Sequence, residues 1–96
     1  MQFEWDDAKA TTNATKHGVT FQEASTVFGD SLAVTFDDPR HSDAEPGFLT
    51  IGVSISGRVL IVSHTDRDEA TRIISARVTS KAERKGYEDG DYPRAG

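Results

Sequence analysis

Cysteine and long hydrophobic runs are both missing from this 96-residue chain. The lack of cysteine excludes disulfides and thiolate metal sites, and it is compatible with a reducing compartment. No apolar run approaches the roughly 20 residues that span a bilayer, so we expect no membrane segment. The first ten residues carry acids where a secretory signal carries bases and an apolar centre. We therefore expect a cytoplasmic protein.

Positive charge is scarce as well, since 11 Lys and Arg residues face 16 Asp and Glu residues, for a net charge of −5. This balance argues against nucleic-acid binding by the chain as a whole. The charges are unevenly distributed, however. Residues 72–85 hold five bases and one acid, whereas residues 30–45 hold five acids and one base. A local basic patch can therefore exist on an acidic chain.

The basic stretch at residues 72–87 changes from a strand-like to a helix-like sequence pattern midway. Residues 72–78 are rich in β-formers, and residues 79–87 are rich in helix formers after a Ser80-x-x-Glu83 capping-box pattern. We predict a strand that runs into a helix. Alternation places Arg72, Ile74 and Ala76 on one sheet face, and Ile73, Ser75 and Arg77 on the other. Arg72 and Arg77 then serve one site only if a bulge or the strand end re-aims one of them.

The remaining elements follow from caps, turns and periodicity. The expected order is a strand or helix lead-in at Phe3–Trp5, a helix from Asp6 or Asp7 to about Lys16 that stops at Gly18, and a helix from Thr20 to Phe28 that opens with a Thr20-x-x-Glu23 capping box. Strands at Leu32–Phe36, Phe48–Ile55 and Arg58–His64, a turn at Thr65–Ala70, the Arg72–Val78 strand and a helix at Ser80–Glu88 follow. This predicts an α+β fold with N-terminal helices, about four antiparallel strands and a C-terminal helix. We expect a single domain over residues 1–88 and a flexible tail over residues 89–96.

Two histidines are candidates for chemistry. His17 ends a predicted helix, where the helix dipole favours positive charge, and it serves either as an acid–base or phosphate-binding group or as a simple cap. His64 precedes Thr65-Asp66-Arg67 at the end of a predicted strand, which is either the edge of a cleft or a solvated turn. The three histidines of the chain lack metal-ligand spacing, so we expect no metal site.

The basic residues offer a second candidate site. Arg72, Arg77 and Arg84 suit bidentate phosphate contacts, and Tyr87 suits stacking on a base. The alternative is a solvated helix face in which Glu88 pairs with Arg84 at the i+4 spacing.

The chain resembles the BrnT toxin family, formerly a domain of unknown function. The resemblance rests on Phe3-Glu4-Trp5-Asp6, Lys9, Asn13, Lys16-His17-Gly18-Val19, Val27-Phe28-Gly29-Asp30 and the RIISAR run at 72–77. It implies a RelE-like ribonuclease fold and a toxin of a type II toxin–antitoxin module that cleaves RNA and arrests translation, without cofactor or metal. It also implies a BrnA-like ribbon-helix-helix antitoxin as partner, in a 2:2 complex that contacts operator DNA only through the antitoxin.

The resemblance also suggests site residues by position. The expected catalytic set is Lys16, His17, Glu45, His64, Arg67 and Arg77, and the expected RNA-binding set is Arg58, Arg72, Lys81, Arg84 and Tyr87. His17 or His64 would act as acid or base, Arg67 and Arg77 would contact phosphate, and Arg72 would alternatively anchor the fold by reaching the acidic segment 30–38. A second hypothesis is a weakened or inactive toxin-like partner and co-repressor of the antitoxin. It follows from Gly47, which stands where many relatives carry arginine, and from the added acids Asp89 and Asp91.

Overall fold

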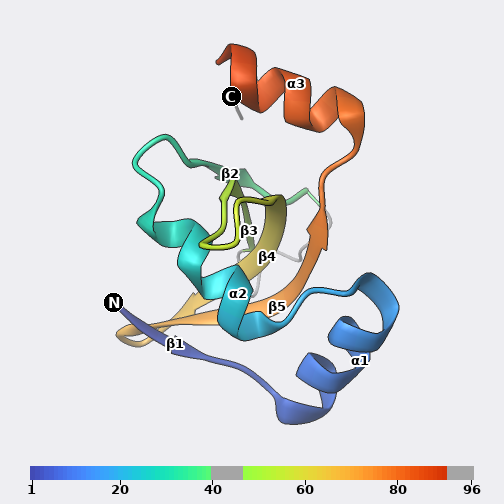
Figure 1. Cartoon of the computed structure of the whole chain (residues 1–96). Helices are drawn as coiled ribbons and strands as arrows, with labels where there is room; N and C mark the ends of the chain where they lie inside the picture. The colour runs from blue at the N-terminus through green and yellow to red at the C-terminus, as the bar shows by residue number, and fades with distance from the viewer. Residues whose placement is uncertain (40–46, 91–96) are drawn as a thin grey trace.

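A computed structural model describes residues 1–39 and 47–90 of the chain, and five strands of this part form one mixed sheet in the order β1-β5-β4-β3-β2 (Figure 1). The strands are β1 (Gln2–Glu4), β2 (Val34–Asp37), β3 (Phe48–Val53), β4 (Val59–Arg67) and β5 (Ala70–Val78), and the helices are α1 (Asp7–His17), α2 (Phe21–Thr26), the 3-10 turn η1 (Val27–Gly29) and α3 (Lys81–Asp89). The predicted α+β class is confirmed. No helix in these two ranges is long and apolar enough to cross a membrane.

The sheet departs from the predicted meander of four antiparallel strands in two places. β1 adds a fifth strand and pairs in parallel with β5, with Glu4 opposite Arg72. β4 also continues to Arg67 and β5 already begins at Ala70. The predicted turn at residues 65–70 is therefore only Asp68 and Glu69, with Asp68 in a left-handed conformation at φ 53°. The turn prediction was wrong because a polar run also suits the exposed end of a two-strand ribbon.

The helix ends follow the predicted local chemistry. The Asp6 side chain accepts hydrogen bonds from the backbone of the first turn of α1, and Gly18 ends that helix in a left-handed conformation at φ 68°. Thr20 caps α2, and Ser80 and Glu83 form a complete capping box on α3. These predicted caps are confirmed. They were predictable from the sequence because a cap needs only residues that are near one another in the chain. α3 reaches Asp89, one residue into the predicted tail, and residues 91–96 lie outside the described ranges.

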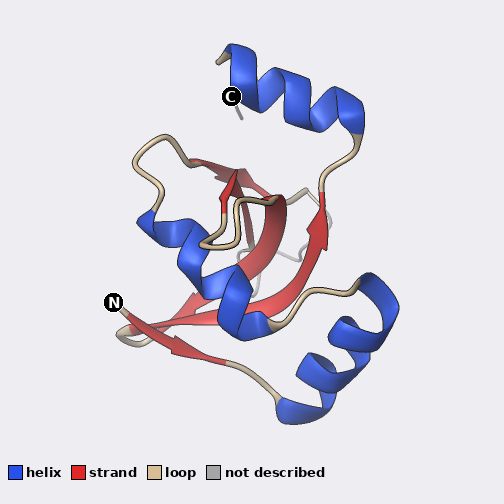
Figure 2. Cartoon of the chain, in the orientation of Figure 1, coloured by secondary structure: helices blue, strands red, loops and turns tan. Residues whose placement is uncertain are grey.

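Each face of the sheet has its own core. On one face, α1, α2 and η1 cover a cluster of Val19, Phe21, Ala24, Val27, Leu60, Val62, Ile73 and Ala76. On the other face, Ile51, Val59 and Ile61 form a smaller cluster with partly buried apolar neighbours, Tyr87 of α3 among them. α3 itself buries no residue, and in Figures 1 and 2 it lies at the opposite end of the molecule from β1. The second face is therefore only partly covered, and it is there that a site can lie open.

A β-bulge in β5 decides which residues reach this second face. Ser63 pairs with Ser75 whereas the next residue, His64, pairs with Ile73, so that Ile74 is the extra residue. Beyond the bulge the alternation is reversed. As a result Arg72, Ser75 and Arg77 share the second face, opposite Thr65, Ser63 and Ile61 respectively. Simple alternation, which places Arg72 and Arg77 on opposite faces, was therefore wrong here, and the bulge, one of the two exceptions considered for this strand, is the reason.

Candidate functional site

Two adjoining hollows, one on the second face and one between α1 and β5, form what we call the groove. The first has a volume of about 350 Å³ and is lined by His17, Ile61, Ser63, Ser75, Arg77 and Glu83, with Phe36 and Leu49 at its apolar side. The second is of similar size and lies between α1 and β5, where Lys9, Asn13, Lys16 and Ile74 line it. His17 and Ser75 line both hollows, so the two are continuous at these residues. The groove therefore brings together three of the predicted catalytic residues: Lys16, His17 and Arg77.

Arg77 is held in the groove by Glu83. Its two terminal nitrogens donate to the two carboxylate oxygens of Glu83 at 2.8 and 2.9 Å. Glu83 also accepts from the Ser80 backbone N–H at 2.8 Å, as part of the capping box. The hydrogen bonds from Arg77 lower the pKa of Glu83 to about 2, against the opposing effect of burial. The ion pair thus fixes Arg77 in the lining of the first hollow, where nearly half of the arginine side chain remains exposed.

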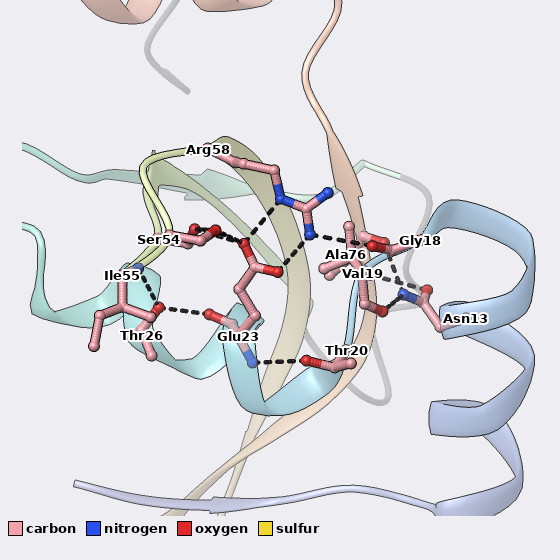
Figure 3. A network of polar contacts seen from close by, with 11 residues as sticks. Asn13, Gly18, Val19, Thr20, Glu23, Thr26, Ser54, Ile55, Arg58 and Ala76 are labelled. Atoms are coloured by element: carbon pink, nitrogen blue, oxygen red, sulfur yellow. Dashed lines mark hydrogen bonds and ion pairs between the residues drawn. The ribbon is translucent and has the colours of Figure 1, made fainter.

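Asn13 connects the helix that carries His17 to the strand that carries Arg77 (Figure 3). This buried side chain donates from Nδ2 to the carbonyl oxygens of Val19 and Ala76 at 3.0 and 2.8 Å. Its Oδ1 accepts from the Ala76 backbone N–H at 3.1 Å. Because Ala76 lies between Ser75 and Arg77, and Val19 lies two residues after His17, Asn13 sets the relative position of the two sides of the groove.

A second polar network, also drawn in Figure 3, locks the β3–β4 hairpin onto α2. Glu23 accepts from Arg58 Nε at 3.0 Å, from Arg58 Nη2, and from the hydroxyls of Ser54 and Ser56. These bonds, Arg58 first, lower the pKa of Glu23 to about 2 although burial acts in the opposite direction. Glu23 is thus engaged by the hairpin, and does not complete the predicted capping box with Thr20. Arg58 Nη2 also donates to the Gly18 carbonyl at 3.1 Å, so the lock extends to the end of α1.

His64 lies on the first face, away from the groove. It sits within β4, not at the predicted strand end, and its side chain is buried against the rings of Phe28 and Phe48 at 4.9 and 5.7 Å. Its Nε2 is 2.8 Å from the Thr50 hydroxyl, and its Nδ1 has no hydrogen-bond partner in the described part of the chain. Burial lowers its pKa, with Asp66 opposing weakly. The structure therefore does not bring His64 to His17.

The other predicted residues are distributed over the molecule. Arg72 binds Glu4 of β1 at 2.8 Å instead of the acidic segment 30–38, so it anchors the sheet edge and the expected partner was wrong. The Tyr87 hydroxyl donates to Asp30, and burial together with this bond raises its pKa to about 12. Arg84 pairs with Glu88 at 3.2 Å as expected for the i+4 spacing. Arg67 ends β4 and does not line the groove. Glu45 lies outside the described residues.

Sequence reasoning missed three polar residues of the first hollow of the groove. Ser63 and Ser75 face each other across β4 and β5, and Glu83 reaches the groove from α3. The serines carry no signal of chemistry in the sequence, although alternation already places Ser75 on the face of Arg77. Glu83 could have been found, since a residue six positions after Arg77 and fixed by a cap points back toward the strand end. The described residues contain no cluster of three or more His, Asp or Glu side chains that could hold a metal.

Comparison with known proteins agrees with this architecture. A small α+β domain here brings a histidine and a lysine of α1 and an arginine of β5 to one groove. A family model described as "Ribonuclease toxin, BrnT, of type II toxin-antitoxin system" matches residues 5–83. The chain belongs to this BrnT family of ribonuclease toxins. It is similar to the crystal structure of the Brucella abortus ribonuclease toxin BrnT, with a TM-score of 0.63 and 25% identity over 84% of this chain and 99% of that one. No curated protein matches the chain.

Proposed function

We propose that the chain is a metal-independent endoribonuclease whose active site is the groove. The observation that carries the proposal is that His17 and Arg77 line one open hollow, although they come from different elements. Lys16 lines the adjoining hollow beside His17, which adds a second cation on the α1 side. The family supplies the reaction class, and the groove supplies groups of the required chemistry.

The reaction needs three functions. A base removes the proton of the RNA 2′-hydroxyl, whose oxygen attacks the adjacent phosphorus, and an acid protonates the 5′-oxygen as the P–O5′ bond breaks. A cation stabilises the negative charge that develops on the phosphoryl oxygens. Arg77 has the planar donor geometry that suits phosphate, and His17 places an exposed imidazole, the side chain most used for acid–base catalysis, in the same hollow. Lys16 adds charge stabilisation, and Ser63 and Ser75 offer hydroxyls to the substrate.

The family assigns a type II module, so an antitoxin is the expected partner. We propose a BrnA-like ribbon-helix-helix protein that binds the toxin in the cytoplasm in a 2:2 complex, silences the groove, and carries the contact to operator DNA. Support comes from family membership and from the open second face of the sheet, where α3 covers little. Loss of RNA cleavage when the two proteins are mixed would be the corresponding result in vitro.

The decisive experiment compares Arg77→Ala with Lys85→Ala. Lys85 is an exposed cation of α3 that pairs with Asp89 and does not line the groove, so it controls for charge. Arg77→Ala should abolish growth arrest and reduce RNA cleavage by about 100-fold or more, as expected for loss of one charge-stabilising group. Its circular dichroism should match the parent. Growth arrest at the parent level in Arg77→Ala would remove the groove from consideration.

Cleavage is also expected to continue in excess EDTA, because side chains alone perform the three functions. Activity lost on chelation and restored by added divalent metal would contradict the proposal. His17→Ala completes the set, with a loss of cleavage comparable to that of Arg77→Ala.

A second candidate function rests on the pair between Arg77 and Glu83. Because Glu83 already neutralises Arg77, the chain could serve as a binding partner and co-repressor of the antitoxin without catalysis. This candidate predicts antitoxin binding with no growth arrest from the parent chain. The expression experiment separates the two functions directly.

A further inference from the structure

A third hollow lies on the other side of the β5–α3 junction. Its volume is about 330 Å³, and it is lined by the hairpin residue Arg58 and by Lys81 and Arg84 of α3, with Val78, Thr79 and Ser80 between them. We call it the basic pocket. Val78 directly follows Arg77 in β5, so the basic pocket and the groove lie at the same end of this strand, although they share no lining residue.

The wall of the basic pocket has an unusual charge for this protein. Its described lining residues include three cations and no carboxylate, although the chain carries a net charge of −5. By contrast, Glu83 lines the first hollow of the groove and Asp6 the second. Glu23 and Glu88 pair with Arg58 and Arg84 from outside this lining, so Lys81 carries the charge that no described acid offsets. A local concentration of cations of this kind attracts anions.

The three cations retain donors for a ligand. Lys81 is exposed and has no ion-pair partner in the described ranges. Arg84 uses only Nε for Glu88, in an exposed pair that is worth little. Arg58 spends Nε and Nη2 on the lock with Glu23 and Gly18, which leaves Nη1 without a bond within the described part, and the same lock holds its guanidinium in place (Figure 3). The backbone of the α3 N-terminus contributes less, because Ser80 and Glu83 already cap it.

We propose that the basic pocket binds a backbone phosphate of the RNA substrate, one that is not cleaved. This inference rests on the proposed function, since it extends the RNA from the groove across the β5–α3 junction. A single-stranded RNA would then be held at two places, with cleavage at His17 and Arg77 and an electrostatic grip at Lys81, Arg84 and Arg58. RNA is favoured over an acidic peptide because arginine and lysine around one hollow suit the compact, multidentate phosphate group.

The test measures binding of a fully 2′-O-methylated RNA of about 12 nucleotides, a length that single-stranded sites accommodate and a chemistry that prevents 2′-hydroxyl attack. The dissociation constant is determined as a function of salt for the parent, for Lys81→Ala/Arg84→Ala and for Lys85→Ala. The double variant should bind about tenfold more weakly at low salt, because its charge-assisted hydrogen bonds to the phosphate are removed. The slope of log K against log salt should fall in magnitude by about 0.7, since one phosphate of the single strand is no longer neutralised. Lys85→Ala should match the parent.

Further readouts keep the proposal falsifiable. With cleavable RNA, the double variant should raise KM by more than it lowers kcat, because the pocket holds substrate and does not touch the reacting atoms. Lys81→Gln alone removes a charge that makes no ion pair in the described structure, so it tests the same interaction without disturbing the pairs on α3. A salt slope equal to that of Lys85→Ala in both pocket variants overturns the inference, and it leaves the proposed function standing if the parent still cleaves RNA. If the pocket variants bind the antitoxin more weakly but bind RNA as the parent does, the inference is also overturned. The pocket would then hold an acidic segment of the antitoxin.

Discussion

Replacing Glu23 with glutamine should destabilise the protein by about 3 kcal/mol. The ordinary pKa of this carboxyl is 4.5 and it falls to about 2 in the folded chain, mainly because Arg58 donates to it. Each tenfold change in an acidity constant corresponds to about 1.4 kcal/mol, so this difference amounts to about 3 kcal/mol at neutral pH. The Glu23 side chain is only 15% exposed, so solvent screening reduces the effect little. The amide keeps the size of the side chain and removes the charge.

The pH dependence of the unfolding free energy provides a second quantitative test of Glu23→Gln. A carboxyl with a lowered pKa stabilises the fold above the pKa of the unfolded chain, and this stabilisation is lost as the pH falls toward the folded value. Between pH 7 and pH 3 the parent should therefore lose about 2 kcal/mol more than Glu23→Gln does. Glu83 also has a pKa of about 2, but it is present in both proteins and its contribution cancels in the comparison.

Urea unfolding at both pH values, followed by the fluorescence of Trp5, measures these differences. Trp5 packs edge-on against Phe21 at 5.9 Å and reports on the core beside the network. Glu88→Gln is the matched control, because its carboxylate pairs with Arg84 in an exposed position and should contribute less than about 1 kcal/mol. If Glu23→Gln and Glu88→Gln unfold alike at pH 7 and pH 3, the lock does not stabilise the hairpin and the reasoning fails.

Two further predictions concern buried polar side chains. Asn13→Ala should cost about 2–4 kcal/mol, because it removes three hydrogen bonds and leaves the backbone groups of Ala76 and Val19 buried without them; thermal unfolding measures the loss, and a change below about 0.5 kcal/mol would contradict the role of Asn13 as a clamp. His64 has a lowered pKa, so the unfolded chain takes up its proton first and stability should fall as the pH drops below about 6.5. His64→Gln should remove this part of the pH dependence between pH 7 and pH 5, and an unchanged slope would show that another group is responsible.

The features that were predictable from the sequence are the local ones. The caps at Asp6, Thr20 and Ser80 and the helix stop at Gly18 each depend on residues within four positions, so the pattern contains the whole interaction. The long-range features were not accessible in the same way. Glu23 had two mutually exclusive partners, the backbone of its own helix and an arginine 35 residues away, and only the fold decides between them.

The placement of the candidate residues was predictable only in part for the same reason. Lys16, His17 and Arg77 line two adjoining hollows, and this arrangement depends on Asn13, which joins segments 63 residues apart. His64 was expected at a cleft because it was placed at a strand end, and the extension of β4 to Arg67 instead buries it. The parallel pairing of β1 likewise required knowledge of where a three-residue strand would dock.

The bulge at Ile74 has a consequence for comparing relatives of this chain. Arg72 and Arg77 share a face although an odd number of positions separates them, because one residue is left out of the pairing. In a relative that lacks this extra residue, an arginine at each end of the strand would still align by type while one of them pointed into the opposite layer. When such sequences are aligned, the count of residues between Ile73 and Ser75 therefore decides which face each arginine reaches, and the identity of the arginines alone does not.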